Sequence, residues 1–139
     1  MLFPKKVKFR KWQTDRTNPK KKAVETRGTS LAFGNFGLKA ETSGRIKSNQ
    51  LESARKTIAR QMQKTGKLWI RVFPDRPFTA KGAEVGMGKG KGDPQGYEVQ
   101  VKPGRVLFEV DGLTEAVARE ALRKAGAKLA VKTRIIQRA

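Results

Sequence analysis

Residues 97–110 read Tyr-Glu-Val-Gln-Val-Lys-Pro-Gly-Arg-Val-Leu-Phe-Glu-Val, and they carry the strongest strand signal in the chain. Tyr97, Val99 and Val101 alternate with polar residues before the Pro-Gly pair at 103–104, and Val106, Phe108 and Val110 return the chain after it. A period of two is typical of a strand with one buried face, and Pro-Gly favours a turn. The stretch therefore predicts an antiparallel hairpin with one face inward.

Two amphipathic helices are expected on either side of this hairpin. The first covers 49–65, where Asn49 can cap the start with Glu52 reaching back, and Gly66 can end the helix. Its apolar face comprises Leu51, Ala54, Ile58 and Met62. The second begins after a capping Thr114, pairs Glu120 with Lys124, and carries a stripe of Val117, Ala118, Ala121, Leu122, Ala125 and Leu129.

Three further strands complete the expected fold. Residues 29–40 favour a strand bent at Gly34 and Gly37, residues 68–73 a buried strand with one embedded cation, and residues 131–137 a closing strand. The resulting order, β-α-β-loop-β-β-α-β, predicts an α+β fold with a mainly antiparallel sheet and two helices packed on one side. We expect residues 1–139 to form a single domain.

The charge of the chain is strongly positive and unevenly spread. With 32 Lys and Arg against 12 Asp and Glu, the net charge is +20. Residues 1–70 hold 18 basic and 4 acidic residues, or +14, and residues 71–139 hold 14 and 8, or +6. Such a charge favours a polyanionic partner, because neutralisation by phosphates releases counterions.

An N-terminal arm at 1–28 holds nine Lys or Arg within its first 22 positions and has no apolar periodicity. A solvated, disordered tail is one interpretation of this composition. The aromatic residues Phe3, Phe9 and Trp12 favour another, since aromatic rings can stack on bases while the neighbouring cations meet phosphates.

The first predicted helix adds a basic ridge of Lys56, Arg60 and Lys64 opposite its apolar face. No acidic residue occurs between Glu52 and Asp75, so the ridge lacks acidic partners within the helix. A solvated face is the alternative, but the high charge of the same half favours phosphate contact.

A glycine-rich loop at 79–96 contains Gly-Met-Gly-Lys-Gly-Lys-Gly at 86–92. Glycine permits close backbone approach, and two lysines can meet phosphate oxygens. Neither lysine is followed by Ser or Thr, which a P-loop requires, and the spacing of the glycines does not give G-x-G-x-x-G. Two interpretations of this loop remain, a contact with nucleic acid and a flexible linker.

Several other classes of function are disfavoured. The chain has neither Cys nor His, which removes the usual metal ligands, nucleophiles and general bases. The acids near the loop, Asp75, Glu84 and Asp93, do not have the spacing of a metal pair. Gly34 to Gly37 matches the GxxG of KH domains, but its flanks favour strands where that motif joins helices. We expect no enzyme activity, cofactor, metal or small-molecule substrate, and no membrane-spanning or signal segment.

Six motifs in order resemble the bacterial large-subunit ribosomal protein L-sixteen family, over nearly the whole chain. They are Lys-Phe-Arg-Lys at 8–11, Phe-Gly-Asn-Phe-Gly-Leu at 33–38, Gln-Leu-Glu-Ser-Ala-Arg at 50–55, Gly-Lys-Leu-Trp-Ile-Arg-Val-Phe-Pro-Asp at 66–75, Met-Gly-Lys-Gly-Lys-Gly at 87–92 and Lys-Pro-Gly-Arg-Val-Leu-Phe-Glu at 102–109. The resemblance implies an α+β fold with a hammerhead-like β motif, bound to large-subunit rRNA beside the aminoacyl-tRNA site.

The resemblance also implies which residues bind RNA. The arm and first helix would anchor rRNA, and with the aromatic and ridge residues the candidates are Lys5, Lys6, Lys8, Arg10, Lys11, Trp12, Arg55, Lys56, Arg60 and Lys64. The loop would face tRNA at the aminoacyl site, and also at the peptidyl site, through Lys81, Met87, Gly88, Lys89, Gly90 and Lys91. The chain departs from the family pattern at Gly86, where an arginine is usual, at Gly82 and at Ala130, where prolines are usual.

The function that these observations favour is a structural constituent of the large ribosomal subunit that supports translation and subunit assembly. Its expected partners are rRNA, tRNA and neighbouring ribosomal proteins, and it is not expected to form homo-oligomers or to bind membranes. The expected location is the cytoplasm, with an organellar ribosome as the alternative. A stand-alone nucleic-acid chaperone or nucleoid protein is the rival from composition, and an RNA-modifying or nucleolytic enzyme is disfavoured.

Overall fold

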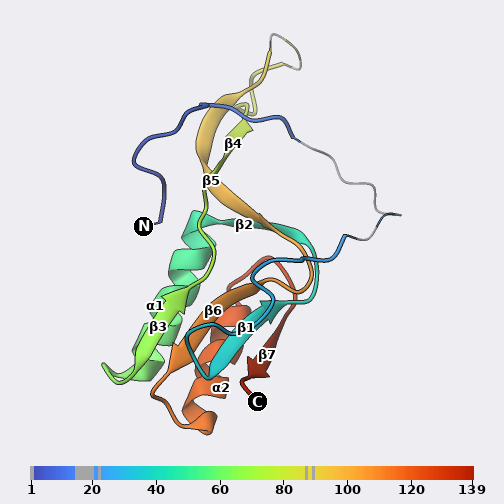
Figure 1. Ribbon diagram of the computed structural model, residues 1–139. Helices are drawn as coiled ribbons and strands as arrows, with labels where there is room; N and C mark the ends of the chain where they lie inside the picture. Colours follow the sequence, from blue (N-terminus) through green and yellow to red (C-terminus); the bar gives the residue numbers. More distant parts are fainter. Residues whose placement is uncertain (1, 15–20, 22, 87, 89) are drawn as a thin grey trace.

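The computed structural model describes residues 2–14, 21, 23–86, 88 and 90–139. Two antiparallel sheets and two helices make up the fold (Figure 1), which confirms the predicted α+β class. The elements are β1 (Phe36–Ala40), β2 (Gly44–Lys47), α1 (Ser48–Met62), β3 (Lys67–Ile70), β4 (Arg76–Ala80), β5 (Asp93–Val101), β6 (Val106–Asp111), α2 (Glu115–Gly126) and β7 (Thr133–Gln137).

The four-stranded sheet has the order β3-β6-β1-β7, and the three-stranded sheet has the order β2-β5-β4. The two helices pack against each other; α2 also contacts β1 and β7, and α1 contacts β2, β3 and β5. The apolar stripes predicted for both helices are buried at Leu51, Ala54, Ile58, Met62, Ala118, Ala121, Leu122 and Ala125, whereas Val117 is exposed.

The predicted hairpin over 97–110 is wrong, because its two strands belong to different sheets. β5 pairs with β2 and β4, and β6 pairs with β1 and β3. Backbone donors around the Pro-Gly turn bond elsewhere: Gly104 N–H donates to the Ala40 carbonyl at 2.8 Å and Val106 N–H to the Gly28 carbonyl at 2.8 Å. The turn therefore passes the chain from one sheet to the other.

The glycine loop is shorter than predicted, since β4 and β5 extend into it from both sides. They leave residues 81–92 between them, and Ala80 pairs with Asp93 at the base. The predicted strand at 68–73 stops before Pro74, and proline has no backbone N–H to donate within a sheet. Pro77 nevertheless lies within β4, which is possible because β4 is an edge strand and its outer side needs no N–H donor.

The other strand predictions are partly right. Residues 68–73 shorten to β3, an edge strand whose side chains are half-buried or exposed, and Arg71 follows it. Gly34 lies before β1, and the register irregularity against β6 falls between Leu38 and Lys39. The short strands β2 and β4 were not predicted, whereas β7 confirms the closing strand.

Helix ends differ from the predicted caps in two cases of three, and one of them is the end of α1, where the helix stops at Met62 with Gln63 as the C-cap and Gly66 lies beyond it. Thr114 accepts a hydrogen bond from Val117 N–H at 3.4 Å, as predicted for α2. At α1 the N-cap is Lys47, whose N–H donates to the Gln50 side chain at 3.0 Å, so Asn49 is not the cap. Within the described residues, no helix is both long enough and apolar enough to cross a membrane.

Candidate nucleic-acid interface

The predicted basic ridge lies only in part on α1, because the helix ends at Met62 and Lys64 follows it in a turn with φ 66°. Lys56, Arg60 and Lys64 are all exposed, and none of them makes an ion pair with a described residue. Arg55 differs, because it is half-buried and pairs with Glu52. Hydrogen bonds from Arg55 hold the pKa of Glu52 below its ordinary value, against the opposing effect of burial.

The cations of α2 are neutralised on the helix itself. Arg119 lies 3.0 Å from Glu115, Arg123 lies 2.7 Å from Glu120, and Lys124 lies 3.7 Å from the same carboxylate. The two helices therefore expose surfaces of different charge. The face of α1 can attract phosphate, whereas the face of α2 is nearly neutral.

Most cations at the start of the arm point into solvent. Lys5, Lys6, Lys8 and Arg10 are exposed, and Lys8 Nζ lies 5.4 Å from the centre of the Phe9 ring. Phe3 and Phe9 are more than half exposed. Apolar rings next to free cations on one segment form a surface that suits stacked bases and phosphates.

The end of the arm contacts the three-stranded sheet and the loop. Lys11 is half-buried and donates through Nζ to the Lys91 carbonyl at 3.1 Å. The Arg76 guanidinium lies 5.5 Å from the centre of the Trp12 ring. Lys81 reaches across the loop to donate to the Gly88 carbonyl. The structure thus brings Lys11, Trp12, Lys81 and Lys91 to one end of the molecule, and Met87 and Lys89 lie outside the described residues.

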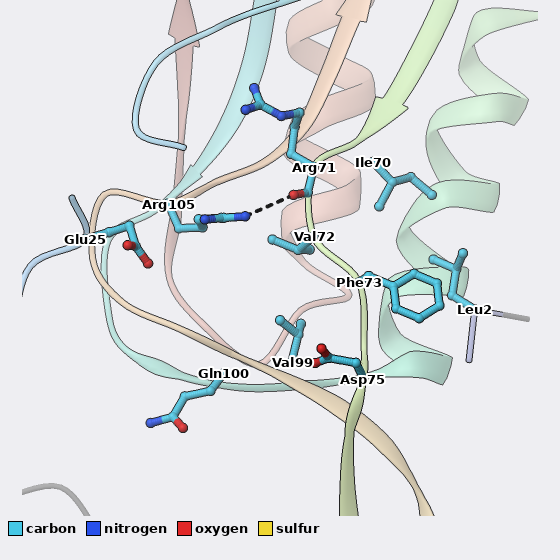
Figure 2. Close-up of a pocket in the computed structure, with 10 residues that line it drawn as sticks. All are labelled: Leu2, Glu25, Ile70, Arg71, Val72, Phe73, Asp75, Val99, Gln100 and Arg105. Carbon is cyan, nitrogen blue, oxygen red and sulfur yellow. Dashed lines mark hydrogen bonds between the residues drawn. The ribbon is translucent and has the colours of Figure 1, made fainter. Parts of the chain in front are cut away.

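The arm also contacts the hydrophobic core, which its lack of apolar periodicity did not predict. Leu2 packs against the hydrophobic core. It lines a cleft of about 510 Å³ together with Ile70, Val72 and Phe73, and Figure 2 shows these side chains beside Arg105, which donates to the Arg71 carbonyl at 3.3 Å. The N-terminus is therefore held at the junction between the two sheets.

A buried carboxylate that the sequence analysis did not single out organises the surface beside β6. Glu109 is fully buried, and one of its oxygens accepts the N–H groups of Ala32, Phe33 and Gly34 at 3.0, 2.9 and 3.0 Å. Its other oxygen pairs with Arg71. A glutamate within the apolar run 106–110 and an arginine within the run 68–73 were the available signal.

The same pair supports an aromatic stack. The Phe33 and Trp69 rings stack with centres 5.7 Å apart, and the Arg71 guanidinium lies 5.3 Å from the centre of the Phe33 ring. Gly34 allows the close approach that this requires, since a side chain there would place its first carbon 2.4 Å from the Val110 carbonyl oxygen. Gly34 is therefore the last donor of the carboxylate-binding segment 32–34, and the chain leads directly into strand β1 where a KH clamp would join helices.

Glu109 gives stability that depends on pH. Burial alone would raise the pKa of Glu109, but the N–H groups of Gly34 and Phe33 and the Arg71 guanidinium outweigh it and hold the pKa below its ordinary value of 4.5. A lowered folded-state pKa contributes stability above the unfolded value and loses it as pH falls through the folded value. We expect the stability difference between wild type and Glu109→Gln to be constant at neutral pH and to shrink below about pH 4.5. Urea unfolding at several pH values measures this, and a constant difference down to pH 2 would contradict it.

No arrangement for metal chemistry is present in the part of the chain that the structure describes: no three His, Cys, Asp or Glu side chains gather there. The candidate residues that it brings together are cations, aromatic rings and glycines. Such an arrangement can bind phosphates and bases.

Comparison with known proteins agrees with this geometry. The family model described as ribosomal protein L16p/L10e matches residues 4–136. Large ribosomal subunit protein uL16 of Rhizobium etli (strain CIAT 652) is 52% identical over 138 residues, which cover 99% of this chain and 98% of that protein. The uL16 proteins of Sinorhizobium medicae and Agrobacterium fabrum show the same identity and coverage. With its α+β fold, its exposed cationic arm and ridge, and this match, the chain belongs to the ribosomal protein L16p/L10e family of the large ribosomal subunit.

Proposed function

We propose that this protein is a non-catalytic structural constituent of the large ribosomal subunit in the cytoplasm, and that it binds rRNA through its arm and the α1 ridge. The observation that carries the proposal is the contrast between the helices. On α1, Lys56 and Arg60 have no acidic partner among the described residues and Arg55 alone pairs with Glu52, whereas Arg119, Arg123 and Lys124 of α2 are all paired. Neighbouring ribosomal proteins are further expected partners.

Binding by this surface is electrostatic and positional. Lysines of the arm and ridge meet phosphates without reading sequence, and exposed Phe9 and Trp12 can stack on unpaired bases. Lys56 and Arg60 of the ridge are held on a helix whose opposite face is buried in the core, so these two cations are fixed relative to the fold. Rigid placement lowers the entropy lost on binding.

We further propose that the loop at 81–92 contacts tRNA at the aminoacyl site. It lies at the tip of the β4–β5 hairpin and extends away from the sheets and helices (Figure 1). Gly86, Gly88 and Gly90 have no atom within 4 Å of where a side chain would begin, so the backbone there is open to a partner. An exposed glycine backbone beside lysine is suited to approach a phosphate chain closely.

Replacing both loop lysines tests the tRNA contact. In large subunits reconstituted with Lys89→Ala/Lys91→Ala, we expect tRNA affinity at the aminoacyl site to fall about tenfold, because two cation contacts with phosphate are lost. Filter binding measures the affinity. The variant should still cosediment with subunits in high salt, as the arm and ridge are intact, whereas a stand-alone nucleic-acid chaperone would dissociate. Unchanged tRNA affinity would contradict the role of the loop.

A further inference from the structure

The end of the arm and the base of the loop hold each other by reciprocal hydrogen bonds. Lys11 Nζ donates to the Lys91 carbonyl at 3.1 Å, and Lys91 Nζ donates to the Trp12 carbonyl. These residues are separated by about 80 positions in the sequence, but Figure 1 shows the arm crossing the β4–β5 hairpin below the loop. Each lysine is thus held by the backbone of the other segment.

Two arginines of the three-stranded sheet strengthen this contact. Arg76 on β4 is buried, donates to the Gln13 and Thr14 carbonyls, the latter at 3.0 Å, and lies over the Trp12 ring. Arg45 on β2 also donates to the Thr14 carbonyl, and it lies 3.8 Å from the buried Glu98. The three-stranded sheet therefore binds the backbone carbonyl groups of the arm and the ring of Trp12.

The position of Lys91 sets how the loop leaves the hairpin. Lys91 lies two residues before Asp93, which pairs with Ala80. At Gly92 the chain passes so close to β4 that a side chain would place its first carbon 2.6 Å from the Ala80 carbonyl oxygen. Gly92 at the end of the loop is thus held close to β4, and the arm holds the preceding residue, Lys91.

We infer that Trp12 is a positioning residue for the loop. In this view, the docked arm holds Lys91 and the base of the 81–92 loop in the orientation that meets tRNA. Binding of rRNA to the arm and contact of the loop with tRNA would then be coupled through one small set of bonds. The inference rests on the proposed tRNA contact for its consequence, but the link between arm and loop is a property of the protein alone.

Repulsion between like charges determines how bound rRNA would affect the docking of the arm. The arm carries Lys5, Lys6, Lys8 and Arg10 in solvent, and it docks beside Arg45, Arg76 and Lys91, so like charges oppose the docking. Phosphates bound to the arm would remove that repulsion. Bound rRNA therefore favours the docked arm, and through it an ordered loop base.

The first test uses the isolated full-length protein without RNA. We expect Trp12→Ala to increase the mobility of the Gly90 and Gly92 amides in ¹⁵N relaxation measurements, and Trp12→Phe to retain most of the wild-type order, because it keeps a ring for Arg76. Val7→Ala is the matched control, since Val7 lies on the same arm and is 39% exposed, compared with 38% for Trp12. Amides that are as ordered in Trp12→Ala as in Val7→Ala would overturn the inference. Trp12 lies outside the hydrophobic core, so the variant retains the fold.

The second test uses reconstituted large subunits. We expect Trp12→Ala to weaken tRNA binding at the aminoacyl site about threefold to tenfold, the range that the loss of one cation–π contact allows. Val7→Ala should have no effect. Trp12→Ala should weaken tRNA binding less in a Lys91→Gln background than in the wild type, because the bond from Lys91 to the Trp12 carbonyl is already lost there. Fully additive effects would overturn the role of Trp12 in positioning Lys91.

The two tests separate the inference from the proposed function. If Lys89→Ala/Lys91→Ala leaves tRNA binding unchanged, the tRNA contact of the loop is wrong, while the amide measurement still decides whether the arm orders the loop. If the amides respond to Trp12→Ala but tRNA affinity does not, the coupling does not reach tRNA, and the inference is overturned at that step.

Discussion

Replacing Glu109 with Leu is expected to lower the free energy of unfolding by about 3–5 kcal/mol, the cost of breaking a buried ion pair by removing one partner. The substitution leaves the Arg71 guanidinium, with a side chain 20% exposed, without its carboxylate. It also leaves the N–H groups of Ala32, Phe33 and Gly34 without an acceptor. Each buried donor without a partner adds to the loss.

Glu109→Gln provides a milder companion that keeps the volume of the side chain. Its amide oxygen can still accept from the Ala32–Gly34 turn, but it carries no charge for Arg71, so we expect an intermediate loss of about 1–3 kcal/mol. If the Leu variant does not fold, the Gln variant still gives a measurable result. Urea unfolding followed by Trp69 fluorescence reports on the same region, because Trp69 stacks on Phe33.

The matched control is Glu120→Gln, which removes one carboxylate from the exposed face of α2. Glu120 pairs with Arg123 and Lys124 at the surface, where solvent screens the interaction. We expect its unfolding midpoint to remain close to that of the wild type. Equal midpoints for the variants at 109 and 120 would show that the buried carboxylate does not organise this part of the fold.

Affinity for rRNA fragments is expected to fall by about 10³ to 10⁵ between 50 and 200 mM salt, if the arm and ridge neutralise roughly six to ten phosphates. Each neutralised phosphate contributes about 0.9 to the slope of log affinity against log salt. Filter binding over this range gives the slope. A flat response would contradict a charge-driven interface.

Two triple variants with the same change in charge locate that interface. Lys56→Gln/Arg60→Gln/Lys64→Gln removes the α1 ridge and should reduce the slope by about 2–3, because three phosphate contacts are lost. Arg119→Gln/Arg123→Gln/Lys124→Gln removes three cations from α2 that already pair with carboxylates, and we expect a much smaller change. Equal slopes for the two variants would show that net charge alone, and not the ridge, drives binding.

The helices could be predicted from the sequence because their stabilising contacts are periodic. Leu51, Ala54, Ile58 and Met62 are buried as their spacing requires, and Thr114 caps α2. Strand pairing could not be predicted in the same way. The alternation around the Pro-Gly turn shows which residues are in strands, but it does not show that Gly104 N–H bonds to Ala40 instead of to a facing strand.

The candidate site likewise has one part that could be predicted from the sequence and one part that could not. The exposed ridge on α1 followed from the lack of acidic residues after Glu52, and this signal is local. The contact between Lys11 and Lys91 joins residues 80 positions apart through backbone carbonyls, which every residue possesses, so the sequence gives no sign of it. Glu109 likewise has its meaning only once the turn at 32–34 is placed beside β6.

Recognition of the arm through its carbonyl groups has an evolutionary consequence. Arg45 and Arg76 donate to main-chain oxygens of Gln13 and Thr14, so these bonds do not restrict which residue occupies the two positions. Insertion or deletion of one residue between Lys11 and Thr14 would instead shift every acceptor out of reach. Selection at positions 13 and 14 is therefore expected to act on the length of the segment more than on its chemistry, whereas Lys11 and Trp12 contribute through their side chains.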